Sequence, residues 1–328
     1  MRQPTYEQWI RQYPSRKLGV NGWILVIYYL IMTLSVTISA VVEMAVRLIG
    51  GIWKQSWKDV LDAAAGSTGS AWGYFLAAAI GLMVLLIWKK PAFWREEIWK
   101  KGAEMKPGAF LGLLCLFMCG QLIYQIFVTI TEVILNMFGL SILEGAASMA
   151  MDMNNFSMFL YGGILAPVTE ELLFRGVIQR QLQPYGKKFA ILCSAFTFGI
   201  FHGNILQTPY AFLVGLVLGY VAMEYSIGWA MVLHMINNLV LGDMLPRLTG
   251  GLPEMVQAAI LWTILLACAV GAVIVVILRR NEISRWMRQE WLNRLYLRCF
   301  FSSGGVITLM VIMGLSIVLT AFALVGPM

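Results

Sequence analysis

The chain has 328 residues, of which 59 % are hydrophobic and 12 % are charged, and its mean hydropathy is +0.75. A soluble domain carries about 45–50 % apolar and about 25 % charged residues, so this composition cannot cover the surface of a soluble globule. It excludes a cytosolic enzyme, a nucleic-acid-binding domain and a disordered chain. The composition favours an integral membrane protein, in which the net charge of +7 matters less than where the charges lie.

Long apolar runs recur along the whole chain. A helix needs about 20 apolar residues to cross a bilayer, and the sequence contains up to nine such runs. They predict an all-α, polytopic helical bundle of about eight to nine transmembrane helices, which forms a single membrane domain over residues 1–328. The runs lie near residues 22–44, 71–88, 109–138, 156–183, 189–205, 208–224, 228–245, 255–278 and 304–326.

Basic residues are distributed unevenly between the two ends of these spans. Twenty of the 24 Lys and Arg residues fall on one side, in segments 1–21, 89–106, 175–188 and 279–298. Because cytoplasmic loops are enriched in Lys and Arg, we expect the N-terminus in the cytoplasm and the C-terminus outside. In a bacterial host this membrane would be the plasma membrane. The opposite side holds only Arg47, Lys54, Lys58 and Arg247.

Two segments on the basic side differ from simple spans. The turn near residues 225–228 carries no basic residue, so we expect it to be recessed from the cytoplasmic surface. In segment 279–301, apolar residues recur every four positions between Arg and Glu residues. This pattern predicts an amphipathic helix in the cytoplasmic interface, followed by a C-terminal span at 304–326. The apolar positions are Ile283, Met287, Trp291 and Leu295.

The fourth run, 156–183, contains three ionisable residues close together. Charged groups cost about 2.5–3.5 kcal/mol each in the centre of a bilayer, so they persist where they are paired, hydrated or useful. Gly162, Gly163 and Pro167 come just before them. Proline suits the first turn of a helix, but it interrupts the backbone hydrogen bonds of the turn that precedes it. We therefore expect a helix that is broken near 163–167, with a new helix from Pro167 and both glutamates in its first turn.

The spacing of the three ionisable residues separates their roles. Glu171 and Arg175 are four residues apart, so they face each other as an ion pair. Glu170 points about 100° away around the helix and has no partner on its own span. An unpaired carboxylate in this environment neutralises, pairs with another helix or does chemistry. Glu170 is therefore the candidate for a chemical role.

The chain has only two histidines, His202 and His234, and both lie inside apolar runs. His234 and Asn238 are four residues apart and share a helix face. Two intramembrane histidines, an unpartnered glutamate and an asparagine form a constellation that is typical of a functional site. We expect Glu170, His202, His234 and Asn238 to line one cavity.

Three motifs occur in order in these spans: Glu170-Glu171-x-x-x-Arg175, Phe198-x-x-x-His202 and His234-x-x-x-Asn238. Together they resemble the motif set of the CPBP family, the CAAX proteases and bacteriocin-processing enzymes, also called the Abi family. The resemblance covers the helices of residues 156–245, which it implies are the catalytic core. It implies an intramembrane endopeptidase that cleaves near the C-terminus of prenylated proteins or matures membrane peptides and bacteriocin-type precursors. The partners would be membrane lipid and a membrane-associated peptide or protein. The implied site residues are Glu170, Glu171, Arg175, His202, His234 and Asn238.

Two mechanisms fit these residues. In the first, Glu170 accepts a proton from water that is also hydrogen-bonded to His202, while His234 and Asn238 donate to the oxyanion. In the second, Glu170, His202 and His234 hold one divalent metal ion such as zinc, and the base must come from elsewhere.

Two other classes of protein also remain open. A secondary transporter would bury Glu, His and Arg near a broken helix, although it usually shows an internal repeat, and none is evident. A non-catalytic immunity or scaffold protein of the same fold would not need all three motifs.

Overall fold

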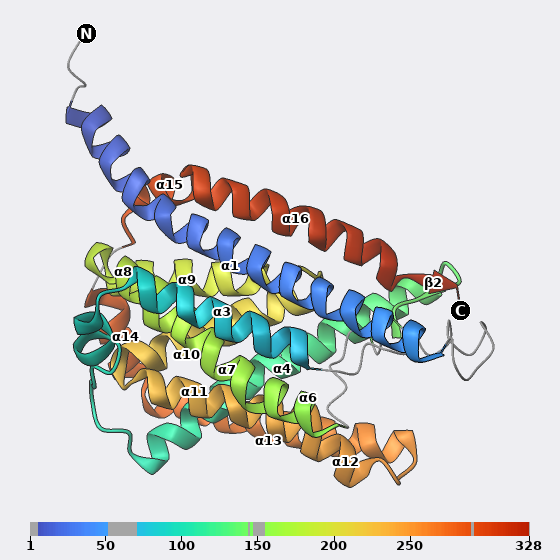
Figure 1. The fold of residues 1–328 in the computed structure, drawn as a ribbon. Coiled ribbons are helices and arrows are strands. Elements are labelled where there is room, and N and C mark those ends of the chain that lie inside the picture. Colours follow the sequence, from blue (N-terminus) through green and yellow to red (C-terminus); the bar gives the residue numbers. More distant parts are fainter. Residues whose placement is uncertain (1–5, 52–70, 144, 147–154, 290–291, 328) are drawn as a thin grey trace.

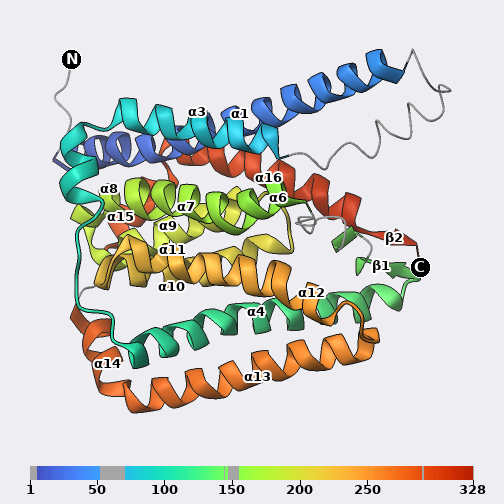
Figure 2. The same cartoon turned by 60° about the horizontal axis from the view of Figure 1, so that its bottom comes forward.

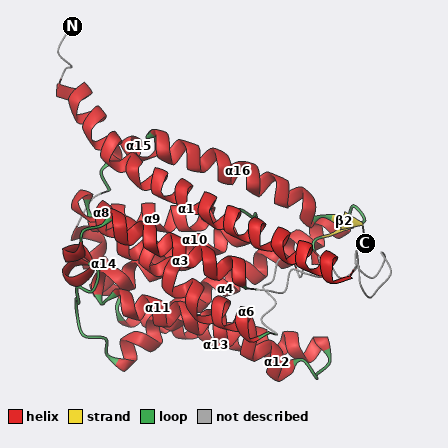
Figure 3. Ribbon diagram, viewed as in Figure 1, coloured by secondary structure: helices red, strands yellow, loops and turns green. Residues whose placement is uncertain are grey.

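The structure is a computed structural model that describes residues 6–51, 71–143, 145–146, 155–289 and 292–327. Helices dominate the described residues (Figure 3), where the strands are a two-residue antiparallel pair, β1 (Leu140–Ser141) and β2 (Gly326–Pro327). The prediction of an all-α membrane bundle is confirmed. Three residues named above lie outside the described part of the chain: Lys54, Lys58 and Trp291.

The long helices form two outer layers around a central group of shorter ones (Figure 2). On one side α1 packs against α3 and α16, and on the other side α4 packs against α13. The central group contains the three motifs, and its α10 packs against α9, α11 and α4. The outer helices are α1 (Tyr6–Gly51), α3 (Trp72–Trp88), α4 (Pro107–Asn136), α13 (Glu254–Leu278) and α16 (Gly304–Leu324).

The central group has three parts, of which the second is a pair of helices. The first is continuous through α6 (Phe156–Leu160), η3 (Tyr161–Leu165), α7 (Ala166–Glu171), η4 (Leu172–Gln179), α8 (Arg180–Leu182) and η5 (Gln183–Tyr185). The second is the antiparallel pair α9 (Lys187–Phe201) and α10 (Gln207–Glu224). The third runs through α11 (Ile227–Ile236), η6 (Asn237–Met244) and α12 (Leu245–Thr249). Of these, η3, η4 and η6 are π-helical.

The outer surface of the bundle is apolar. Val270, Val273 and Ile277 of α13 are 58–61 % exposed, as expected for side chains that face lipid rather than water. Among the described residues, four helices are long and apolar enough to cross a membrane, and α3 is a shorter apolar helix. The four candidate spans are Ser15–Val46, Pro107–Asn136, Glu254–Leu278 and Gly304–Leu324. The total of eight to nine spans remains a prediction.

The basic segments lie together at one end of the bundle. The connection between α3 and α4, the short helix α8 and the helix α14 (Arg280–Gln289) occupy the same end in both views (Figures 1 and 2), opposite α12 and β2. This arrangement agrees with the uneven distribution of Lys and Arg in the sequence. The assignment of this end to the cytoplasm remains a prediction.

The expected break at 163–167 is wrong in its form, because the backbone stays helical throughout. Residues 161–165 are π-helical, and the flanking Leu160 and Ala166 both have right-handed helical dihedral angles. Pro167 does lie in the first turn of α7, but both glutamates fall at the end of that segment rather than in its first turn. The wider π turn tolerates the missing proline N–H without opening the helix.

The single helix expected over 279–301 is also wrong, because the segment forms two helices. After α14, a second helix, α15 (Arg294–Phe301), begins where the side chain of Asn293 accepts a hydrogen bond from the N–H of Leu295. Asparagine is a favoured N-cap residue, so it starts a new helix at this point. α15 packs against α1 and α16 and buries Cys299 and Phe300, whereas Ile283 and Met287 of α14 remain exposed.

The turn between α10 and α11 is covered by other parts of the chain. The N–H groups of Gly102 and Ala103 donate to the carbonyls of Tyr225 (2.6 Å) and Glu224 (2.8 Å). The Glu224 carboxylate accepts from Lys187 Nζ at 3.0 Å and from Nε1 of Trp286, on α14, at 3.1 Å. These contacts hold the turn beneath the α3–α4 connection and α14, which supports the expected recess.

We predict that a cysteine at the covered turn reacts slowly with a membrane-impermeant maleimide. Ser226→Cys and the matched control Ser284→Cys, on the exposed face of α14, are labelled from the basic side, with the wild-type chain as background. We expect Ser284→Cys to react several-fold faster because Ser284 is exposed, whereas Ser226 is only partly exposed. Equal rates would show that the turn is open to the solution.

Candidate active site

The most deeply buried charged group of the central layer is the Glu171 carboxylate. Its Oε1 accepts from Nη1 of Arg175 at 3.0 Å, and neither side chain is exposed. This is the ion pair that the four-residue spacing predicts. The same Oε1 accepts from Nδ1 of His234 at 3.0 Å, so Glu171 also orients a histidine of another helix.

Arg175 is held by the helix opposite as well as by its own. Its Nη2 donates to the carbonyl of Gly215 at 3.3 Å, and one turn later Gln179 Nε2 donates to the carbonyl of Gly219 at 2.8 Å. A Cβ at Gly219 would approach Gln179 Oε1 to 2.8 Å, so the small residue permits this contact. The Gly215-x-x-x-Gly219 spacing is typical of closely packed membrane helices, and the sequence analysis missed it.

Glu170 differs from Glu171 in both exposure and partners. Its side chain is 32 % exposed, whereas that of Glu171 is fully buried. Its Oε2 lies 3.8 Å from Nε2 of His234, so that ring lies between the two carboxylates. Tyr28 of α1 and Tyr161 of η3 are within electrostatic range of Glu170, and no motif in the sequence indicated them.

A phenylalanine ring links the two histidines. Phe198 makes edge-on contacts with His202 and with His234, at centroid distances of 4.9 and 5.8 Å, and the guanidinium carbon of Arg175 lies 4.2 Å from the same ring. His202 Nδ1 is 2.9 Å from the carbonyl of Phe198. A carbonyl only accepts, so Nδ1 carries the proton and Nε2 of neutral His202 has a free lone pair. His202 is within electrostatic range of Glu170.

The proline of α7 explains where Asn238 is held. Within η3 the N–H of Ala166 donates to the carbonyl of Tyr161, five residues back. The next residue in that pattern is Pro167, which has no N–H, so the carbonyl of Gly162 is left without a helical donor. Asn238 Nδ2 donates to this carbonyl at 2.9 Å. Freed backbone groups in membrane helices are satisfied by neighbouring side chains in this way.

The structure therefore places the predicted residues in two groups. Glu170, Glu171, Arg175 and His234 are in direct contact, and His202 joins them through Phe198. Among the described residues, the hydrogen bonds of the Asn238 side chain are with Gly162 and its neighbour Asn237.

The alternative with a metal ion would require three donor side chains to converge. In the part of the chain that the structure describes, no three His, Cys, Asp or Glu side chains gather closely enough to hold one. The three-ligand zinc site of Glu170, His202 and His234 considered above therefore stays a prediction.

Comparison with known proteins agrees with the motifs. Residues 152–240 match the family model described as "Type II CAAX prenyl endopeptidase Rce1-like". The comparisons with curated proteins and with solved structures find no match. The matched region contains α6 to α11 and all three motifs, and it supports an intramembrane protease function. Residues 152–240 thus resemble a domain of the Rce1-like CAAX prenyl endopeptidases, which is consistent with the CPBP family that the motifs resemble.

Proposed function

We propose that this protein is an intramembrane endopeptidase that hydrolyses a peptide bond of a membrane-associated protein or peptide by activating water. The observation that carries the proposal is the division between the two adjacent glutamates. Glu171 is fully buried and is hydrogen-bonded to Arg175 and His234, whereas Glu170 is partly exposed beside the same histidine. A general base must reach water, and of the two only Glu170 can.

The role that we propose for His234 requires a proton on each of its ring nitrogens, because Nδ1 faces the Glu171 carboxylate, which only accepts, and Nε2 donates to the oxyanion. Glu171 and Arg175 neutralise each other, which leaves the Glu170 carboxylate next to the His234 ring. With both protons on His234, the cluster of Glu170, Glu171, Arg175 and His234 has two positive and two negative charges. In this state Nδ1 donates to Glu171 and the Nε2–H is available to an oxyanion.

Hydrolysis follows from these positions. Glu170 accepts a proton from water, whose second hydrogen bond goes to Nε2 of His202, and the water oxygen attacks the peptide carbonyl carbon. The Nε2–H of His234 and the second Nδ2 hydrogen of Asn238 stabilise the tetrahedral oxyanion. Glu170 then passes its proton to the leaving nitrogen as the C–N bond breaks.

The substrate classes that fit are the C-terminal segment of a CAAX-type protein and a membrane-bound peptide precursor. The family match supports a peptide substrate over the alternatives of a secondary transporter or a non-catalytic scaffold. The orientation that we propose places the basic end of the bundle in the cytoplasm.

We predict that Glu170→Gln abolishes turnover without unfolding the protein. The change keeps the size of the side chain and removes only its charge and basicity, and loss of a positioned general base costs about 10²–10⁴-fold in rate. Turnover of a panel of membrane-peptide substrates is normalised to folded protein, and the melting temperature is measured in detergent. Glu97→Gln, an exposed glutamate at the basic end, is the matched control and keeps wild-type turnover. A Glu170→Gln variant with full activity would contradict the assignment.

We predict that Glu171→Gln acts first on stability. It leaves Arg175 without its counter-ion in a fully buried site, and breaking one partner of a buried pair costs about 3–5 kcal/mol. Arg175→Gln is expected to have a similar effect, and activity falls with the folded fraction in both variants. Thermal unfolding in detergent measures the change. If Glu171→Gln melts like the wild type and has no activity, Glu171 is the base and the roles of the two glutamates are reversed.

A further inference from the structure

A hydrogen-bonded relay leads from Asn238 away from the motifs to α10. Asn238 Oδ1 accepts from Nδ2 of Asn237 at 3.0 Å, and Asn237 Oδ1 accepts from the hydroxyl of Tyr210 at 2.8 Å. Tyr210 lies 27 residues before Asn237 in the sequence and belongs to none of the three motifs. The relay therefore ties the third motif to the first turn of α10.

The relay has only one consistent direction. The carbonyl of Gly162 can only accept, so it requires the Nδ2 side of Asn238 to face it. The Oδ1 of Asn238 then faces Asn237 and accepts a hydrogen bond from its Nδ2. The Oδ1 of Asn237 therefore faces Tyr210. The tyrosine hydroxyl supplies the proton at the end of the chain. Each amide is thus held at both ends and cannot rotate by 180° without losing a hydrogen bond.

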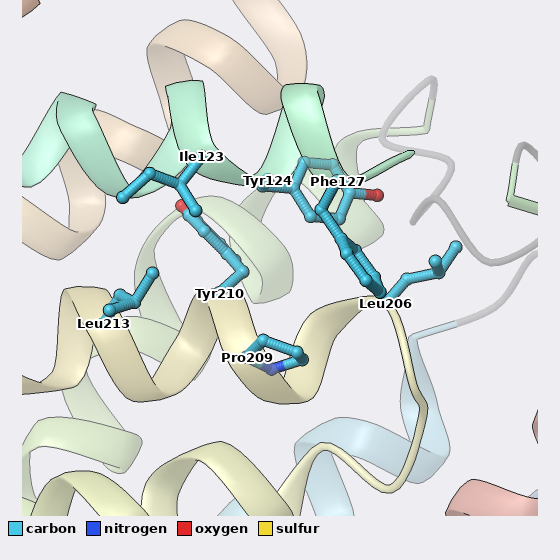
Figure 4. A pocket seen from close by; sticks show the side chains of 7 residues that line it. All are labelled: Ile123, Tyr124, Phe127, Leu206, Pro209, Tyr210 and Leu213. Atoms are coloured by element: carbon cyan, nitrogen blue, oxygen red, sulfur yellow. The ribbon is translucent and has the colours of Figure 1, made fainter. Parts of the chain in front are cut away.

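The ring of Tyr210 is fixed independently of its hydroxyl. It packs against Tyr124 of α4 with ring centroids 5.5 Å apart. Both rings line an apolar pocket between α4 and α10 (Figure 4), with Ile123 and Phe127 on the α4 side. A tyrosine held by its ring and donating through its hydroxyl is a rigid end point for the relay. Loss of the hydroxyl alone would leave this packing in place.

We infer that Tyr210 is a positioning residue for the hydrolysis, acting through Asn237 to hold the Asn238 amide in the orientation that donates to the oxyanion. The inference rests on the proposed function. Without the hydroxyl, the Asn237 amide is free to rotate, and Asn238 loses the partner that holds its Oδ1. Oxyanion donors act when they are preorganised, so loss of orientation lowers the rate of the chemical step and not substrate binding.

The test compares Tyr210→Phe with the matched control Tyr124→Phe. Both remove one hydroxyl from the same pocket, but in the described residues only the Tyr210 hydroxyl donates to Asn237. We expect Tyr210→Phe to lower kcat about three- to tenfold with KM unchanged, the loss expected for one hydrogen bond. Asn237→Leu gives the same change, because it removes the middle of the relay. Tyr124→Phe keeps wild-type kcat.

A double-mutant cycle separates positioning from a general effect on folding. In the Asn238→Ala background Tyr210→Phe is expected to have no further effect on kcat per folded enzyme, since the amide that it positions is gone. Additive losses, or equal losses for Tyr210→Phe and Tyr124→Phe, would overturn the relay. Glu170→Gln is measured in the same assay, so an active Glu170→Gln enzyme signals failure of the proposed function itself. An inactive Glu170→Gln enzyme with an unaffected Tyr210→Phe enzyme refutes only the relay.

Discussion

The Glu171 carboxylate organises the centre of this bundle, because an ionised group with no exposed surface needs its counter-ions and donors where it lies. Its Oε1 accepts hydrogen bonds from Arg175 of its own helix and from His234 of α11. Arg175 also donates a hydrogen bond to the carbonyl of Gly215 on α10. Oε1 therefore links its own helix directly to α11, and Arg175 extends this link to α10. One turn further along α10, a Cβ at Gly219 would approach Gln179 Oε1 to 2.8 Å, so this glycine permits the close approach of the two helices.

A second constraint comes from the backbone. Pro167 removes one N–H, the π turn of η3 absorbs the irregularity, and the unsatisfied carbonyl of Gly162 becomes the anchor for Asn238. His234 of α11 is held to Glu171 of α7 and Asn238 of η6 to Gly162 of η3, so both anchors lie on the helical stretch that carries the first motif. In our account, catalysis uses the groups that these anchors leave free: Glu170, His202 Nε2 and the remaining hydrogens of His234 and Asn238.

Much of this arrangement was predictable from the sequence because it depends on local spacing. Apolar runs located the helices, and the four-residue interval of Glu171 and Arg175 predicted their pairing. The partner of His234 was not predictable, because both glutamates are 63 or 64 positions away and helix rotation decides which one meets Nδ1. The π-helical segments could not be predicted from the sequence for another reason. Glycine and proline signal that an α-helix is disturbed, but the wider turn that replaces a break depends on tertiary contacts such as that of Asn238 with Gly162.

The most direct test of the central claim is the protonation state of the two histidines. They are the only imidazoles in the chain, so protein labelled with ¹⁵N-histidine gives two ring spin systems by NMR. Our account predicts a neutral His202 with the proton on Nδ1, and a His234 with a proton on each ring nitrogen. A His234 ring with bare Nε2 in the active wild-type enzyme would contradict the account, because such a ring cannot donate to an oxyanion.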